Sequence, residues 1–162
     1  MGATPTRKTE RLNTVQDLPG EPSLTPSPGV VLDTNVVLDW LLFDDPAARA
    51  VAIAVMQQRL RWIATTAMRD ELAQVLGAGL AAARGRDPVS LLQAWDRYVT
   101  PRPPAASHPL RCRDADDQMF IDLALGAGAS WLVSRDRAVL ALSRRAALLG
   151  LRIVRPAEWM PQ

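Results

Sequence analysis

Four short apolar runs, separated by segments with helical spacing of their apolar residues, constrain the fold of this chain more than any other feature. The runs are 29–32, 62–65, 130–133 and 151–154. Short runs of this kind, without a polar alternation, are typical of strands buried on both faces. Strands that alternate with helices form a parallel sheet with helices on both of its faces. We therefore expect an α/β domain with three layers, α/β/α, around a central and mostly parallel sheet.

The segments between these runs carry the caps and the apolar spacing of helices. Asp45 is a suitable N-cap and Pro46 a suitable first helical residue. In chain order, the first expected helix begins at Asn35, the second extends from Pro46 to about Arg59, and the third follows Thr66 as its N-cap. The fourth spans 88–99, the fifth follows Asp117, and the sixth ends at Leu149. The Pro-rich stretch 101–109 is expected to be a loop.

Length and composition limit the chain to one domain of ordinary globular character. It has 162 residues, of which 48% are hydrophobic, and its formal net charge is +2. A single cysteine and a single histidine exclude an internal disulfide framework and a Cys/His zinc site. Residues 1–28 are rich in Pro, Ser, Thr and charge, which predicts a flexible arm before a domain at 29–162. With no signal peptide and no membrane-spanning segment apparent, we expect a cytoplasmic protein without a membrane partner.

Acidic residues recur where the expected strands end. Asp33 ends the first strand, Glu71 lies one turn into the helix after the second, Asp117 precedes a helix, and Asp136 follows the third run. In an open parallel sheet, ligands bind beyond the carboxyl ends of the strands. All four side chains lie near such ends, so we expect them to converge.

Converging carboxylates need either protons or a cation. Two unit charges at 4 Å repel by about 4 kcal/mol at an effective dielectric constant near 20. Oxygen ligands without His or Cys nearby favour Mg²⁺ or Mn²⁺ over zinc. A site of this kind polarises phosphate and activates water, so the pattern indicates metal-dependent phosphodiester chemistry.

Each acid also has an ordinary structural explanation. Asp33 and Asp136 are suitable helix N-caps, and Glu71 is suited to the solvated face of an amphipathic helix. Asp117 and its acidic neighbours suit a helix N-terminus through the helix dipole. The functional interpretation therefore depends on the coincidence of the four positions rather than on any one residue.

Four segments in this order resemble the signature of PIN domains, and in particular the toxins of bacterial toxin–antitoxin systems related to the VapC ribonucleases. The resemblance covers residues 30 to about 160. It is carried by Val31-Leu32-Asp33-Thr34-Asn35-Val36-Val37, Arg69-Asp70-Glu71-Leu72, Asp114-Ala115-Asp116-Asp117-Gln118-Met119-Phe120 and Leu132-Val133-Ser134-Arg135-Asp136, with a closing Ile153-Val154-Arg155-Pro156-Ala157-Glu158-Trp159.

The resemblance implies a Mg²⁺- or Mn²⁺-dependent endoribonuclease, the toxin of a type II toxin–antitoxin system, that is neutralised by a small antitoxin and forms a homodimer. By position, it assigns the metal ligands and catalytic acids to Asp33, Glu71, Asp117 and Asp136. Asn35, Ser134 and Asp114 correspond to secondary positions of the site.

Arginines flank the acidic motifs, and two explanations stay open for them. Arg69, Arg113 and Arg135 are candidates to bind the phosphates of an RNA substrate, or they neutralise nearby carboxylates.

Two other functions remain as alternatives. A non-catalytic PIN-fold binding module would use the same acidic pocket to engage a partner protein through an arginine. A phosphatase with Asp33 as nucleophile is disfavoured, because that chemistry usually needs a second acid at the position that Asn35 occupies.

Overall fold

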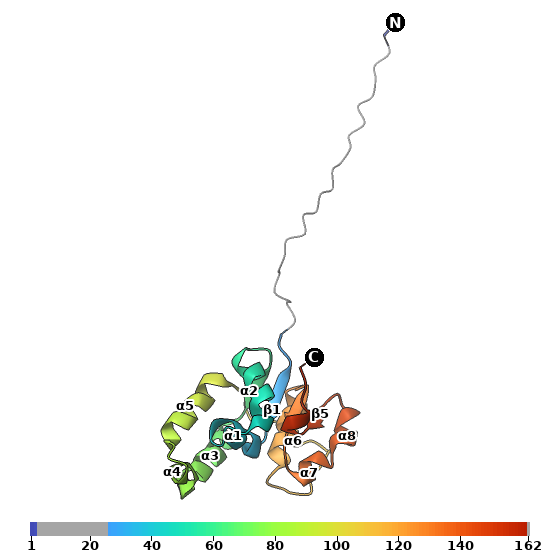
Figure 1. Ribbon diagram of the computed structural model, residues 1–162. Coiled ribbons are helices and arrows are strands. Elements are labelled where there is room, and N and C mark those ends of the chain that lie inside the picture. The colour runs from blue at the N-terminus through green and yellow to red at the C-terminus, as the bar shows by residue number, and fades with distance from the viewer. Residues whose placement is uncertain (3–25, 162) are drawn as a thin grey trace.

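The computed structural model describes residues 1–2 and 26–161, and most of the expected flexible arm (3–25) lies outside these ranges. Its centre is a five-stranded sheet in the order β3-β2-β1-β4-β5, and every neighbouring pair is parallel. Helices lie on both sides of the sheet (Figure 1), which confirms the expected three-layer α/β/α architecture. The strands are β1 Gly29–Leu32, β2 Arg61–Ala64, β3 Val99–Pro101, β4 Trp131–Val133 and β5 Arg152–Val154.

Eight α-helices and three single-turn elements connect the strands in the described part of the chain. The α-helices are α1 Thr34–Leu41, α2 Arg49–Met56, α3 Thr66–Val75, α4 Ala81–Ala83, α5 Pro88–Tyr98, α6 Gln118–Gly126, α7 Arg137–Leu140 and α8 Ser143–Ala147. The shorter elements are the 3₁₀ turns η1 (Pro46–Ala48) and η3 (Pro156–Glu158) and the π-helical turn η2 (Leu76–Leu80).

The apolar runs form the centre of the sheet because their side chains are buried on both faces. Val30 pairs with Trp62 on one side and with Trp131 on the other. Val30, Trp62, Ile63 and Leu132 are completely buried. This packing fixes the register, and the carboxyl ends of β1 and β4 consequently lie side by side.

The strand β3 was not predicted. The sequence favoured a helix up to Val99 and a loop from Pro101, but the chain turns extended at Val99 and pairs with β2. Proline lacks a backbone N–H and is found mainly on edge strands, where β3 lies. The proline that makes this segment look like a loop is therefore compatible with its position in the sheet.

Three helix boundaries also differ from the prediction. Thr65, not Thr66, caps α3, and its hydroxyl accepts a hydrogen bond from the backbone N–H of Met68. The second helix starts with η1 and ends at Met56. The expected helix up to Leu149 is divided into α7 and α8, because the Leu142 N–H bonds three residues back to Val139 and tightens the backbone there.

Among the described residues, no helix has the length and apolar character needed to cross a membrane.

Candidate active site at the carboxyl ends of the strands

Asp33 is the most buried of the four predicted acids. It directly follows β1 and caps α1, with one carboxylate oxygen accepting from the Asn35 N–H at 3.3 Å. The Ser134 hydroxyl donates to the other oxygen at 2.5 Å from the end of the adjacent strand β4. Burial raises the pKa of Asp33, whereas the Ser134 hydrogen bond opposes this rise. Ser134 therefore stabilises a charged carboxylate in a site that water reaches poorly.

Asp136 lies beside Asp33 and has a role in folding. Its side chain caps α7 and accepts from the backbone N–H groups of Ala138 at 2.6 Å and Val139 at 3.2 Å. Its own N–H donates to the Ser134 hydroxyl at 3.0 Å. A single serine thus links Asp33 and Asp136, and it holds the ends of β1 and β4 in a fixed relation.

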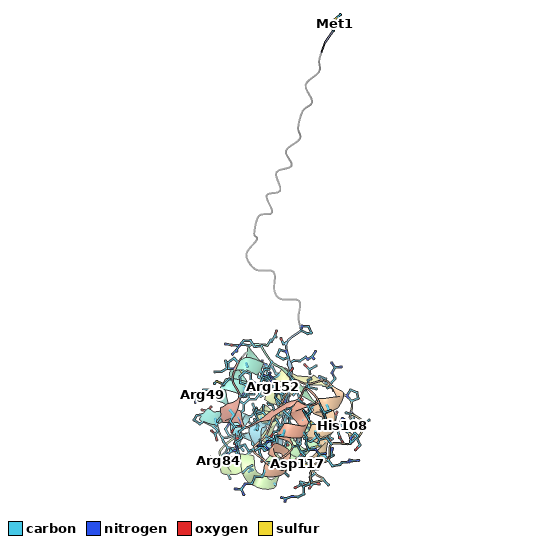
Figure 2. The ribbon with its side chains drawn as sticks, turned by 90° about the vertical axis from the view of Figure 1, so that its right-hand side faces the viewer. Met1, Arg49, Arg84, His108, Asp117 and Arg152 are labelled. Carbon is cyan, nitrogen blue, oxygen red and sulfur yellow. The ribbon has the colours of Figure 1, made fainter. Side chains whose placement is uncertain are left out.

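Asp117 immediately precedes α6 and makes no capping hydrogen bond through its side chain. Burial, together with repulsion by Asp33, Asp136, Asp114 and Glu71, raises its pKa to about 7. It lies at the lower end of the folded body in Figure 2. Unlike Asp33 and Asp136, Asp117 has no role in capping that explains an acid at this position.

Glu71 lies on α3 and turns toward the same group of acids. Burial raises its pKa, the Thr34 side chain at the start of α1 favours its charged form, and the charges of Asp33 and Asp116 add to the rise. Its Oε2 atom is buried and has no hydrogen-bond partner within the described residues. The Glu71 side chain therefore does not lie on a solvated helix face, which was the ordinary structural explanation for it.

The four predicted acids are therefore brought into one electrostatically coupled group, although they come from four separate segments. Asp114 also acts on Asp117 and accepts from the Asp116 N–H at 3.0 Å. An open hollow of about 470 Å³ adjoins the group, and its charged lining residues are Arg113, Asp114, Asp136 and Arg137. In the part of the chain that the structure describes, no three Asp, Glu, His or Cys side chains are arranged to hold a metal ion.

The donor set is suited in kind to Mg²⁺ or Mn²⁺. Apart from the Cys112 thiol, which lies within reach of the charges of Asp117, Asp136 and Asp114, the coupled groups are carboxylates. Ser134 and Thr34 contribute hydroxyl oxygens beside them. The partnerless Oε2 of Glu71 and the raised pKa of Asp117 both indicate negative charge that the described residues do not neutralise. Hard divalent cations bind such oxygen ligands and would relieve this charge.

Two of the three flanking arginines are engaged in ion pairs. Arg69 forms a bidentate pair with Asp96, with N–O distances of 2.7 and 2.8 Å. Nη1 of Arg135 lies 2.8 Å from both carboxylate oxygens of Asp39. Arg113 is exposed and makes no ion pair with any described residue, although it lines the hollow beside Asp114 and Asp136.

Sequence reasoning missed the residues that support this site. Asp39 is 4% exposed in α1, and together with Asp45 it surrounds the Arg135 guanidinium. A signal existed, because Asp39 interrupts the apolar face of α1, and a buried charge needs a partner. Gln118 fixes the loop before α6 by bonding Cys112, Leu110 and Asp122, and only the folded structure shows this.

Comparisons with known proteins agree with the fold. No curated protein matches the sequence. Among solved structures, one similar chain occurs in the crystal structure of VapBC2 from Rickettsia felis bound to a DNA fragment from their promoter. The two chains are 13% identical, the match covers 77% of this chain and 98% of that chain, and the TM-score is 0.56. At this identity the likeness concerns the fold alone. The family model for the PIN domain matches residues 29–138, more than half of the chain, and the chain therefore belongs to the PIN domain family.

Proposed function

We propose that this protein is a Mg²⁺- or Mn²⁺-dependent endoribonuclease that acts as the toxin of a type II toxin–antitoxin system. The observation that carries the proposal is the pair Glu71 and Asp117. Both are acids at the coupled site, and neither caps a helix through its side chain as Asp33 and Asp136 do. Membership of a family whose domains are generally nucleases supports the same conclusion.

In this proposal, Asp33, Glu71, Asp117 and Asp136 hold the divalent ion. The ion would polarise the scissile phosphodiester and activate the attacking water. Ser134 keeps the Asp33 carboxylate oriented toward the site and favours its charged form. Asn35 is exposed beside Asp136 in a neighbouring hollow, where its side chain is available to a substrate.

Arginines beside the acids are proposed to contact the RNA backbone. Arg113 lines the hollow beside the acids, together with Arg137, and has no ion-pair partner among the described residues, so it is the first candidate. The Arg135 side chain is half exposed, and only its Nη1 is bound by Asp39, so its other N–H groups are available for a phosphate. Arg69 is occupied by Asp96, and we expect its contribution to be smaller.

RNA digestion with each metal and with a chelator tests the proposal. We expect cleavage with Mg²⁺ or Mn²⁺, none with chelator, and at least about a hundredfold loss in Asp33→Asn and Asp117→Asn, a conservative figure for charged groups at a reacting centre. Asp70→Asn is the matched control, because Asp70 is exposed on α3 next to Glu71. Full cleavage by both site variants under controlled metal would refute the proposal.

An antitoxin partner is part of the same proposal. The VapBC2 structure is a toxin–antitoxin complex with promoter DNA, and the shared fold suggests a similar assembly here. Co-expression with the product of a short neighbouring reading frame tests this partner, and relief of growth arrest with a stable complex is the expected result.

A catalytically inactive binding module is the second candidate, and the absence of a preassembled metal geometry within the described residues favours it. Calorimetry with Mn²⁺ separates the two functions. A nuclease site binds Mn²⁺ with an affinity that Asp33→Asn abolishes, whereas a module that takes only a partner's arginine shows no such binding.

A further inference from the structure

A hollow of about 590 Å³ lies at the amino-terminal ends of the strands, opposite the acidic site. It is lined by residues just before or at the start of β1, β2, β4 and β5, and by the C-terminal segment 159–161. In Figure 2, Arg152 of this hollow lies toward the top of the folded body, where residues 26–28 enter it, and Asp117 lies toward the bottom. The hollow is therefore separate from the proposed catalytic site.

The charged residues that line this hollow are all arginines, Arg59 and Arg152. Arg59 donates through Nε to the side-chain amide oxygen of Gln57 at 3.0 Å, a neutral partner that does not offset its charge. Neither arginine pairs with a carboxylate among the described residues, in contrast to Arg69, Arg135 and Arg155. Two uncompensated guanidinium groups in one concave site favour an anionic ligand, and guanidinium geometry matches phosphate well.

Aromatic rings hold one of these arginines in place. The Arg152 guanidinium lies over the Trp131 ring, 5.0 Å from its centroid, and Trp159 packs edge-on against Trp131. Trp131 and Trp159 are nearly buried, so the surface offered to a ligand is the planar guanidinium rather than the rings beneath it. A guanidinium plane held in this way is a stacking surface for a nucleobase.

We propose that this hollow binds the phosphate and base of a nucleotide. Arg59 and Arg152 contact the phosphate, and the supported guanidinium plane faces the base. The volume falls within the range of small-ligand sites. The nucleotide is either free or part of an RNA chain, and the second source rests on the proposed ribonuclease function.

Binding is measured by fluorescence anisotropy of a labelled single-stranded oligoribonucleotide, with 5′-AMP as competitor and chelator present to prevent turnover. Arg59→Gln and Arg152→Gln are each expected to weaken binding by about tenfold, because each removes charge-assisted hydrogen bonds. For the oligoribonucleotide, each should also lower the dependence of log K on log salt by about 0.7. Arg84→Gln changes an exposed arginine that lies toward the opposite, lower end of the folded body in Figure 2. It makes the same charge change and should alter affinity less than about twofold.

The outcomes separate the possible ligands. Competition by 5′-AMP identifies a free-nucleotide site, and binding of the oligoribonucleotide without such competition identifies a tract for RNA. An equal loss in Arg84→Gln, no binding of either probe, or tighter binding of a glutamate-rich peptide overturns the proposal. Arg152→Lys, which keeps the charge but not the plane, should retain phosphate binding better than Arg152→Gln. Because no step depends on cleavage, an inactive acidic site would not affect this result.

Discussion

Replacing Asp117 with asparagine should stabilise the metal-free protein at neutral and alkaline pH. The substitution keeps the size of the side chain and removes a charge that burial and four neighbouring acids disfavour. The same residue is proposed to be essential for cleavage. A gain in stability together with a loss of activity is the outcome expected for a residue kept for function rather than for folding.

The magnitude follows from the pKa of Asp117, which rises from 3.8 to about 7 on folding. Each pKa unit corresponds to about 1.4 kcal/mol, so the upper bound is about 4 kcal/mol. Asp117 is partly exposed, and solvent screening reduces the expected gain in the free energy of unfolding to about 1–2 kcal/mol. The folded state binds a proton that the unfolded chain releases. The stabilising contribution of protonated Asp117 is therefore complete below about pH 4 and is lost as the pH rises through about 7.

Urea unfolding in chelator, at about pH 4 and about pH 8, measures this difference. Asp117→Asn should unfold at higher urea than the natural protein at the alkaline pH, and the two should converge in acid. Asp70→Asn controls for a change in net charge and should show no such pH dependence. A gain that is the same at both pH values, or a loss at alkaline pH, would refute the electrostatic reasoning.

Three further predictions concern the fold around the two edges of the sheet. Ser134→Ala should lower the free energy of unfolding by about 2 kcal/mol, and by more at alkaline than at acid pH, because it removes the hydrogen bond to the charged Asp33. Urea unfolding at both pH values measures this difference. Gln58→Gly should raise the free energy of unfolding by about 0.5–1 kcal/mol, because Gln58 has φ +58° after α2, a left-handed conformation that favours glycine. Thermal unfolding measures this gain, and an unchanged melting temperature would contradict the prediction. Gly126→Ala should lower the free energy of unfolding by about 1–2 kcal/mol, since the new Cβ would lie 2.7 Å from that of Ala105. The control Gly77→Ala places a Cβ where no atom lies within 4 Å, and it should be neutral or stabilising in the same unfolding assay.

The sequence was sufficient to predict the sheet because its main strands are buried on both faces. Val30, Ile63 and Leu132 lie in uninterrupted apolar runs, and burial on both faces requires such runs. β3 could not be predicted in the same way. It is a short edge strand whose pairing with β2 depends on the tertiary position of α5, and its proline is typical of a loop.

The grouping of the acids was predictable, but the bonds that hold them were not. Positions at strand ends indicate which edge of the sheet a residue occupies, and Asp33 and Asp136 are both found at that edge. The link through Ser134 connects residues 101 positions apart in sequence. The pairing of Asp39 with Arg135 spans 96 positions, and neither partner's spacing along the chain indicates the other.

The acids divide by whether folding alone accounts for them. Asp33 and Asp136 cap helices, so a protein with no chemistry to perform would still gain from an acid at both positions. Folding alone does not account for acids at Glu71 and Asp117. Both have raised pKa values, Glu71 has a buried oxygen without a partner in the described chain, and Asp117 caps nothing through its side chain. Each therefore costs stability in the metal-free protein, which is the cost expected of the proposed cation site and not of helix caps at the same sheet edge.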